Sequence, residues 1–306
     1  MQDELSEVIG APIRVDAPLA EYTSFRIGGP ARYLCIVRDA EKACRALTTA
    51  RAKDLPCMLL GHGSNVLFPD GGYDGLVVSY QADRIEVHGG RIWAEGGAAT
   101  MDLVTTAARH GLAGLSFAAG IPGTVGGAIS GNAGAYGRAV GDLLVEAVLV
   151  SADGAKRRRA TAAELDLAYR SSGLRKTGEL VESVTLGLEQ GDQTSEWTEI
   201  EEILAHRASR LPPPELPSAG SFFRNLPPPE PGAQRVPAGK LLDECGCRGL
   251  RVGDAAVYEG HANIVVNLGR ATAREVLRLA EEMQRRVRER FGVQLRPEVR
   301  IVTRTR

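Results

Sequence analysis

Apolar and polar segments alternate along the first 65 residues in a pattern that predicts strand, helix, strand and loop. Residues 33–37 (YLCIV) are a continuous apolar run and predict a short buried strand. Asp39 is placed to cap a helix over residues 39–53, which carries apolar positions on one face. A second apolar run, 56–60, predicts another strand that ends at the glycine loop 61–65.

The middle of the chain reads as short strands separated by turns. Three strands are expected within residues 75–97, the last two joined by a hairpin at Gly89-Gly90. Thr100 is the expected cap of a helix that ends at Gly111. A further strand is predicted over residues 143–151.

The last third of the chain begins with a predicted helix over residues 197–210, with Thr198 and Glu201 as a capping box. Prolines recur between residues 212 and 231, so this segment cannot be a regular helix. A last helix should open at Thr272, with Glu275 completing its capping box, and end at Gly292. A strand over residues 297–302 is expected to follow.

Glycine is concentrated in one stretch, residues 111–137, where nine of 27 residues are glycine. Such spacing suits tight turns, or places where the backbone approaches a ligand and its N–H groups face an anion. The loop 61–65 (GHGSN) is a second candidate of this kind. Val66 leaves the G-x-G-x-x-G fingerprint incomplete and no G-K-[ST] follows, which disfavours a Rossmann domain or a P-loop.

Composition adds constraints on partners and compartment. The chain has 306 residues, enough for two or three domains, with 37 basic against 38 acidic residues. No global field therefore favours nucleic acid or an anionic membrane, and the basic run 157–159 is expected at a solvated strand edge. The acidic start has no signal-peptide core and no apolar run is long enough to cross a bilayer. We expect a cytoplasmic protein without membrane insertion.

Cysteine usage argues against cross-links and metal. The five cysteines are at positions 35, 44, 57, 245 and 247, with no C-x-x-C pair. In a chain without an export signal this favours free thiols over disulfides. The histidines do not cluster near residues 245–247, so no metal site is expected.

Eight sequence blocks in one order carry a resemblance to a known family. They are TSFRIGGPA (23–31), GHGSN (61–65), GIPGTVGGA (120–128), NAGAYG (132–137), YR (169–170), GSFFRN (220–225), AGKLL (238–242) and PE (297–298). Together they closely resemble the UDP-N-acetylenolpyruvoylglucosamine reductases, in the shorter of that family's two types. The resemblance covers nearly the whole chain.

The resemblance implies an α+β fold, the FAD-binding fold of the vanillyl-alcohol-oxidase kind, with two α+β subdomains and a C-terminal α+β substrate domain. The corresponding divisions are residues 1–82, 83–192 and 193–306. It also implies non-covalent FAD with NADPH as reductant. The implied cofactor-binding residues are Gly61, His62, Gly63, Ser64, Asn65, Val66, Ile121, Pro122, Gly123, Gly126, Gly127, Asn132 and Gly134. In the family both loops face FAD through backbone N–H groups, which would satisfy two phosphates without added cations.

The implied reaction reduces an enolpyruvyl ether to a lactyl ether, and it assigns three catalytic residues. Arg170 would bind the substrate carboxylate, into which negative charge spreads during reduction. Ser221 would donate a proton to the α-carbon. Glu298 would either hydrogen-bond the developing enolate as a neutral acid or orient Arg170. Taken singly, each would be read as a turn residue or a surface ion pair, and their joint occurrence in family order favours function.

The resemblance further implies substrate contacts from Tyr169, Arg207, Arg210, Asn225, Lys240 and His261. The two arginines could equally satisfy carbonyls at the end of their helix, and His261 could equally be a packed residue. The chain departs from the family at Leu226, where proline is usual, in the long proline-rich insert 228–236, and at His62.

Two other functions stay open: another flavin oxidoreductase of the same fold, or a non-catalytic module that binds FAD or a nucleotide sugar. Ser221, Arg170 and Glu298 favour the reductase. The expected partners are the UDP-sugar and NADPH, with no nucleic acid and no obligate protein partner.

Overall fold

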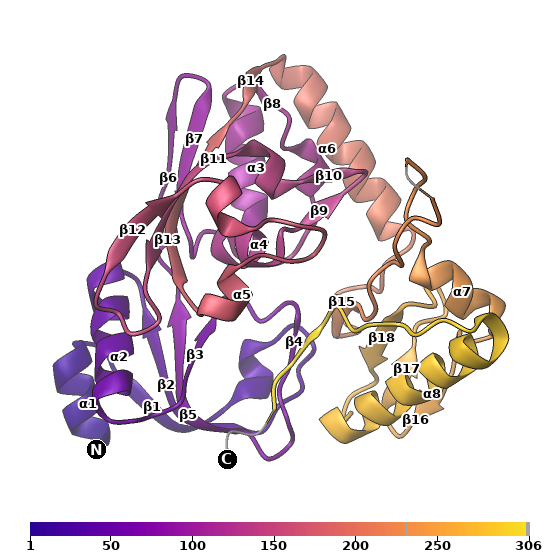
Figure 1. Cartoon of the computed structure of the whole chain (residues 1–306), viewed down its shortest axis with the longest axis horizontal. Coiled ribbons are helices and arrows are strands. Elements are labelled where there is room, and N and C mark those ends of the chain that lie inside the picture. The colour runs from indigo at the N-terminus through magenta and orange to yellow at the C-terminus, as the bar shows by residue number, and fades with distance from the viewer. Residues whose placement is uncertain (231, 304–306) are drawn as a thin grey trace. The chain divides into compact units, whose positions relative to one another are not determined.

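The computed structural model describes residues 1–230 and 232–303, so residue 231 of the predicted proline-rich insert lies outside the described residues. The chain forms two compact units (Figure 1). The large unit contains Met1–Ala17, Ala31–His62 and Asp74–Arg207, and the small unit contains Pro18–Pro30, Gly63–Tyr73 and Ala208–Arg306. The division into three domains stays a prediction.

The first sheet of the large unit has the strand order β1-β2-β5-β3. Its strands are β1 (Ile13–Pro18), β2 (Pro30–Val37), β3 (Cys57–Leu60) and β5 (Tyr73–Tyr80), and β3 runs parallel to β5. Helices α1 (Gln2–Ile9) and α2 (Ala40–Ala52) share a buried core with these strands. The predicted cap of α2 is confirmed, because the Asp39 carboxylate accepts a hydrogen bond from Lys42 N at 2.8 Å.

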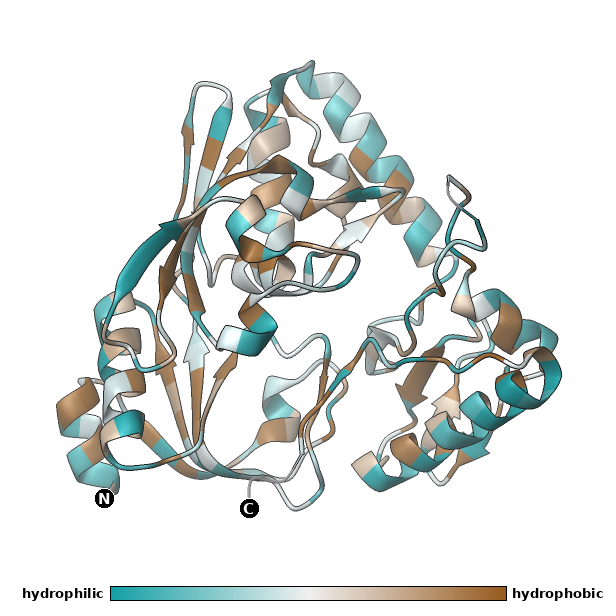
Figure 2. Ribbon diagram, viewed as in Figure 1, coloured by the Kyte–Doolittle hydropathy of each residue, from teal (hydrophilic) through white to brown (hydrophobic). Residues whose placement is uncertain are grey.

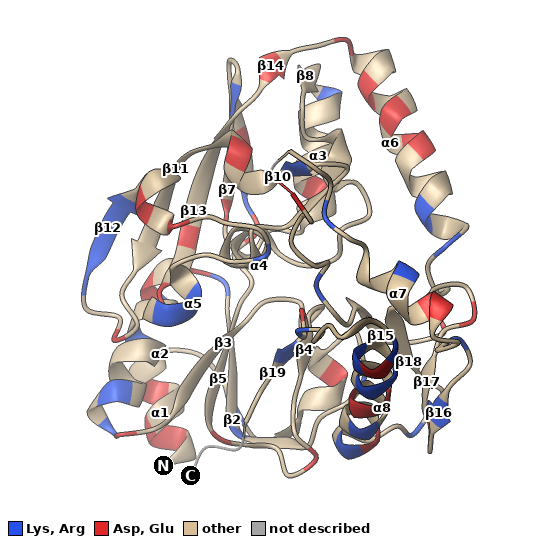
Figure 3. Ribbon diagram, turned by 45° about the vertical axis from the view of Figure 1, so that its right-hand side comes forward, with Lys and Arg blue, Asp and Glu red and all other residues tan. Residues whose placement is uncertain are grey.

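The second sheet of the large unit is antiparallel, in the order β12-β11-β13-β7-β6. Its strands are β6 (Ile85–His88), β7 (Arg91–Glu95), β11 (Leu144–Val150), β12 (Arg157–Ala160) and β13 (Leu180–Gly187). The predicted hairpin at Gly89-Gly90 joins β6 to β7. The predicted strand edge is also confirmed: β12 is the hydrophilic edge strand in Figure 2, and its ribbon is blue, for basic residues, in Figure 3.

The large unit has further elements, several of which lie within the glycine-rich stretch 111–137. They are the helices α3 (Thr100–Arg109), α4 (Val125–Gly131), α5 (Leu174–Thr177) and α6 (Gln193–Ala208), the short strands β8 (Leu112–Ala113), β9 (Gly134–Ala135), β10 (Arg138–Ala139) and β14 (Glu189–Gln190), and the 3-10 turns Ser116–Ala118, Val140–Leu143 and Ala163–Leu165. Helix α4 was not predicted, since its sequence VGGAISG has three glycines and low helix propensity.

Two predicted caps are wrong. Ala99 is the N-cap of α3, and the Thr100 hydroxyl instead donates to Gly123 O at 3.2 Å. Helix α6 begins four residues earlier than predicted, so Thr198 lies inside it and donates to Thr194 O. Asp192 satisfies the start of α6 in place of the predicted capping box, because its carboxylate accepts from Ser195 N at 2.8 Å.

The small unit is built on a four-stranded sheet in the order β15-β18-β17-β16. Its elements are the 3-10 turn Leu19–Tyr22, β4 (Val66–Leu67), β15 (Ser218–Ser221), α7 (Ala238–Glu244), β16 (Arg251–Val252), β17 (Ala255–Val257), β18 (Ile264–Asn267), α8 (Ala273–Phe291) and β19 (Arg300–Ile301). The predicted capping box of α8 and its end at Gly292 are confirmed. The strand predicted over residues 297–302 is reduced to β19, which pairs in parallel with β4.

Within the described ranges, no helix is long and apolar enough to span a bilayer. The same residues contain no group of three His, Cys, Asp or Glu side chains arranged to hold a metal ion. The five cysteines are free thiols.

Candidate active site

In the large unit, the first glycine loop lies against the second. Gly61 directly follows β3, and a Cβ at this position would lie 2.4 Å from the Thr124 hydroxyl oxygen. Thr124 is the N-cap of α4, where its hydroxyl accepts from Gly127 N at 3.2 Å. Only glycine at position 61 lets the two loops approach this closely.

In the small unit, Gly63 allows a similarly close approach to the chain before Thr23. Its φ is +63°, and a Cβ would lie 2.1 Å from Tyr22 O. Among the residues that the structure describes, none accepts a hydrogen bond from the backbone N–H of His62, Gly63 or Asn65. The side-chain Oδ1 of Asn65 is also buried and without a partner in this described part of the chain.

Unsatisfied backbone donors and a buried acceptor are costly unless a ligand or water meets them. The loop 61–65 therefore fits a polar, anionic cofactor such as FAD.

The second glycine loop contributes mainly by packing. Gly123 has a φ of +128°, and its carbonyl accepts from Thr100 N at 3.0 Å. The N–H of Gly126 donates to Gly96 O at 2.8 Å, and that of Gly127 to the Thr124 hydroxyl. These two N–H groups are thus engaged within the protein, and position 126 is tightly packed, since a Cβ there would lie 3.0 Å from Gly96 O.

Asn132 holds the turn that carries Tyr169 and Arg170. This buried residue caps the end of α4; its side-chain Oδ1 accepts from Gly141 N and its Nδ2 donates to Ala168 O, both at 3.1 Å. Both polar atoms of its side chain are therefore bonded to the protein, which favours a supporting role for this predicted cofactor ligand.

Arg170 sits in a tight two-residue turn. Ala168 and Ser171 exchange backbone hydrogen bonds at 3.0 Å, and Arg170 adopts a φ of +53°, an uncommon value for a residue with a side chain. Its Nη2 donates to Gly134 O at 2.7 Å, and its guanidinium carbon lies 5.4 Å from the centre of the Tyr169 ring. The turn and Gly134, another predicted site residue, thus hold this guanidinium in place.

A second cation of the large unit lies near Arg170. The Nε of Arg207, at the end of α6, is buried and has no hydrogen-bond partner among the described residues. Burial lowers the pKa of Arg207, and the charge of Arg170 lowers it further against an opposing effect of Tyr136. Gly120 has no side chain to displace this guanidine, since a Cβ there would lie 3.0 Å from the Nε. A desolvated cation next to another cation favours an anionic ligand.

Arg207→Met should separate stability from binding. Removing a partly buried cation whose Nε lacks a hydrogen bond among the described residues should raise the free energy of unfolding by about 1 kcal/mol. The same change should raise KM for an anionic substrate, because the charge that attracts it is lost. Thermal unfolding and steady-state kinetics check the two effects, and a variant with lowered stability and unchanged KM would contradict this view of the site.

In the small unit, Ser221 and Glu298 are held on adjacent segments. Ser221 ends β15 and pairs with Ile264, after a bulge at Gly220, whose φ is +73°. The next residue, Phe222, accepts a hydrogen bond through its carbonyl from Glu298 N at 2.7 Å. Asn65 Nδ2 also donates to Glu298 O, at 3.4 Å. The small unit thus brings together Ser221, Glu298 and part of the first glycine loop.

Two other predicted substrate contacts lie on or beside α7. The Asn225 Oδ1 accepts from Ala238 N, the first residue of α7, at 3.2 Å. Lys240 lies in the first turn of the same helix with an exposed side chain. Asn225 therefore supports the helix that presents Lys240.

His261 lies in the turn before β18 and is partly buried. Burial lowers its pKa, and the cations Arg210 and Arg248 add to this effect. Its Nδ1 faces Asn263 N at 3.2 Å and accepts this hydrogen bond, so the neutral ring carries its proton on Nε2. Arg210, the last predicted substrate contact, follows the end of α6 in the small unit.

The departure at Leu226 has a structural explanation. Its N–H donates to Val236 O at 2.9 Å, and the two residues form an isolated β-bridge. Proline could not donate this bond. The bridge closes the base of the predicted insert, a few residues after Ser221.

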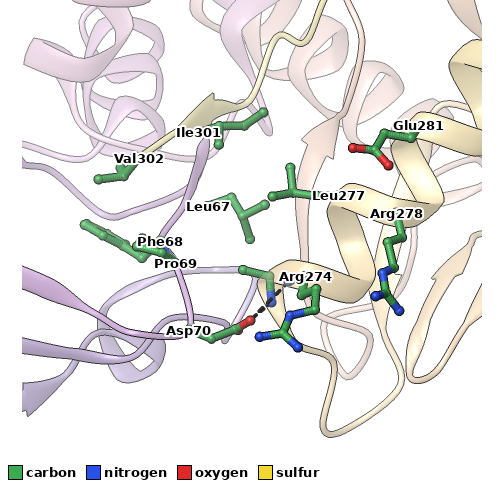
Figure 4. Close-up of a pocket in the computed structure, with 11 residues that line it drawn as sticks. Leu67, Phe68, Pro69, Asp70, Arg274, Leu277, Arg278, Glu281, Ile301 and Val302 are labelled. Carbon is green, nitrogen blue, oxygen red and sulfur yellow. Dashed lines mark hydrogen bonds between the residues drawn. The ribbon is translucent and has the colours of Figure 1, made fainter. Parts of the chain in front are cut away.

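A cavity of about 370 Å³ in the small unit contains none of the predicted site residues (Figure 4). It lies between α8 and the β4–β19 pair, where Leu67 and Leu277 point toward each other. At its end the Asp70 carboxylate accepts from Ala273 N at 2.7 Å and from Arg274 N at 3.1 Å, which caps α8. This cavity lies between packed elements of the small unit and outside the candidate site.

Comparison with known proteins decides the family. Residues 31–158 match the model of an FAD binding domain, and residues 212–302 match the C-terminal domain of UDP-N-acetylenolpyruvoylglucosamine reductase. The chain is 40% identical over 305 residues to UDP-N-acetylenolpyruvoylglucosamine reductase 2 of Symbiobacterium thermophilum, covering 98% of this chain and 96% of the relative. The chain belongs to the UDP-N-acetylenolpyruvoylglucosamine reductase family.

Other members of the UDP-N-acetylenolpyruvoylglucosamine reductase family agree with this. A reductase from Synechococcus sp. is 40% identical over 293 residues, covering 95% of this chain and 91% of the relative. The crystal structure of the Thermus caldophilus reductase superposes with a TM-score of 0.78 at 33% identity, covering 96% of this chain and 99% of that one. The predicted family and the predicted FAD-binding α+β fold are confirmed.

Sequence reasoning gave no role to Asn263, which lies next to the segment that follows Ser221. It contacts the backbone on both sides of Phe223 and is almost fully buried. Its position two residues after the predicted His261 was the available signal.

Proposed function

We propose that this chain catalyses the NADPH-dependent reduction of UDP-N-acetylenolpyruvoylglucosamine to UDP-N-acetylmuramate, a step in making peptidoglycan precursors, in the cytoplasm. The observation that carries the proposal is family membership over nearly the whole length of the chain. When bound, FAD supplies the hydride chemistry that connects NADPH to the substrate alkene.

The residues that would hold FAD are those of the two glycine loops. The unengaged N–H groups of His62, Gly63 and Asn65 suit phosphate oxygens, and the buried Oδ1 of Asn65 suits a hydroxyl or N–H donor. Gly61 lets the first loop pack closely on Thr124, and Gly126 lets the second loop approach Gly96 O.

On the substrate, Arg170 would bind the carboxylate, with its guanidinium fixed by Gly134 O and the turn 168–171. Arg207, the desolvated cation nearby, would bind a second anionic group of the UDP-sugar. Ser221 would donate the proton to the α-carbon, and Glu298 would stabilise the developing charge or orient Arg170. Tyr169, Arg210, Lys240 and His261 remain proposed substrate contacts.

Anaerobic absorbance measurements test this function. Adding NADPH to the FAD-loaded protein should bleach the flavin band, and adding the enolpyruvyl UDP-sugar should restore it. Absence of bleaching would contradict the NADPH-linked activity and favour a non-catalytic binding module. Bleaching that reverses only with another oxidant, not with the UDP-sugar, would favour a different flavin oxidoreductase of the same fold.

A further inference from the structure

The side chain of Asn263 continues the β-ladder past the point where β15 ends. Strand pairing between β15 and β18 ends at Ser221 and Ile264, and the backbone of Asn263 adds one more bond by accepting from Phe222 N at 2.8 Å. Beyond this the side chain takes over: Oδ1 accepts from Phe223 N at 2.9 Å and Nδ2 donates to Phe223 O at 2.8 Å. The primary amide of Asn263 thus bonds both the N–H and the C=O of one residue, Phe223.

The opposite side of the same segment holds Glu298. Phe222 O accepts from Glu298 N at 2.7 Å, Phe223 forms an isolated bridge with Pro297, and Arg224 N donates to Arg296 O at 2.9 Å. Residues 222–224 therefore lie between Asn263 and the segment 296–298. A shift of Phe222 or Phe223 would move the Ser221 hydroxyl and the Glu298 carboxyl together.

Asn263 is well suited to resist such a shift. It is 2% exposed, so its amide bonds do not compete with water. Its own N–H donates to His261 Nδ1 at 3.2 Å, which ties the residue to the preceding turn. Phe222 and Phe223, each 1% exposed, anchor the segment 222–224 in the core.

We propose that Asn263 is a positioning residue for proton donation, which holds Ser221 and Glu298 in register through the peptide groups of Phe222 and Phe223. The proposal rests on the proposed function. It assigns to Asn263 no contact with substrate or cofactor.

We call the two hydrogen bonds between the Asn263 amide and Phe223 the Asn263 clamp. Asn263→Asp removes the donor of this clamp with almost no change in side-chain shape. At neutral pH the carboxylate can still accept from Phe223 N, but it has lost the N–H that donates to Phe223 O, and two oxygens then face each other. The flavin should still bleach with NADPH at the wild-type rate, while its return with the UDP-sugar should slow by about 10- to 100-fold, as expected when reacting groups are displaced.

Protonation should restore the clamp in this variant. A buried carboxyl has a raised pKa, and its protonated form again carries a donor for Phe223 O. The ratio of variant to wild-type return rates should therefore rise as the pH falls from about 8 to about 6. A purely structural defect would not recover on acidification. Asn263→Ser, which has no titrating group there, should be slow at every pH.

Asn267→Asp is the matched control. Asn267 is the last residue of β18, the strand that directly follows Asn263, and it is also 2% exposed. Its Nδ2 donates to Phe25 O at 3.2 Å and its Oδ1 accepts from Gly269 N at 2.8 Å, away from residues 221–223. This variant should lose stability but keep the wild-type return rate.

The outcomes separate the clamp from the function itself. If the flavin absorbance of the wild-type protein does not bleach with NADPH, or does not return with the UDP-sugar, the proposed function fails before any variant is compared. If wild type cycles, the clamp is overturned by a wild-type return rate in Asn263→Asp, by equal slowing in Asn267→Asp, or by a pH-independent rate ratio. Loss of FAD from both Asn263 variants also overturns it, because the residue would then be needed for folding.

Discussion

In Ser221→Ala, the flavin absorbance is expected to bleach normally with NADPH. Its return after addition of the UDP-sugar should be about 100- to 10,000-fold slower than in the wild type. The hydroxyl is the group proposed to protonate the α-carbon, a step that takes no part in reduction of the flavin by NADPH. Stopped-flow absorbance at the flavin band measures both phases in one protein. The change removes a single oxygen from a half-buried residue at the end of β15, so folding should be preserved.

Ser218→Ala provides the control for this change. Ser218 begins the same strand, and its hydroxyl accepts a weak hydrogen bond from Gly220 N at 3.4 Å. Both phases should stay within about twofold of wild type, as for a substitution that removes no important bond. A return rate in Ser221→Ala equal to that of Ser218→Ala would eliminate the proton-donor role.

Gly63→Ala is expected to give the largest loss of cofactor and stability. The new methyl group would lie 2.1 Å from Tyr22 O, a backbone atom, at a φ of +63° that disfavours any side chain. Overpacking and the left-handed conformation together should lower the free energy of unfolding by about 2–5 kcal/mol. The loop 61–65 must move to relieve the clash, so FAD content after purification should also fall. Thermal unfolding and flavin absorbance per chain measure the two effects.

Gly89→Ala separates the effect of overpacking on stability from that of the left-handed backbone conformation. Gly89 has nearly the same φ, +60°, but a Cβ there would meet nothing within 4 Å, at the tip of the β6–β7 hairpin. This variant should lose only about 1–2 kcal/mol from the left-handed conformation and retain FAD. Equal stability and equal FAD content in the two variants would contradict the proposed packing of the first glycine loop.

Elements with strong local signals were predictable from sequence. Asp39 and Thr272 have side chains that satisfy the first N–H groups of the helices they precede, and both caps are present. Thr198 carries the same kind of signal but lies inside α6, because Asp192 offers an earlier carboxylate and the helix extends back to it. Helix α4 has no apolar periodicity to detect, since three of its seven residues are glycine.

The family was predictable from the sequence, whereas the hydrogen bonds within the candidate site were not. The blocks around residues 61–65, 170, 221 and 298 pointed to the family, which the comparisons confirm. They did not reveal that the amides of Gly126 and Gly127 are engaged within the protein, or that Asn132 supports the turn of Arg170. Such roles depend on contacts between segments distant in sequence, and a residue type alone is compatible with either role.

The bridge between Leu226 and Val236 affects how freely the insert 228–236 can vary in length. Because a hydrogen bond closes the base of the insert, the chain beyond it adds only loop-closure entropy, and doubling its length costs about 0.6 kcal/mol. Natural insertions, or a reporter peptide placed by design, can therefore accumulate a few residues from the proposed proton donor with little effect on its backbone. In this protein, the length of the proline-rich insert is thus largely uncoupled from the backbone of β15, which carries Ser221.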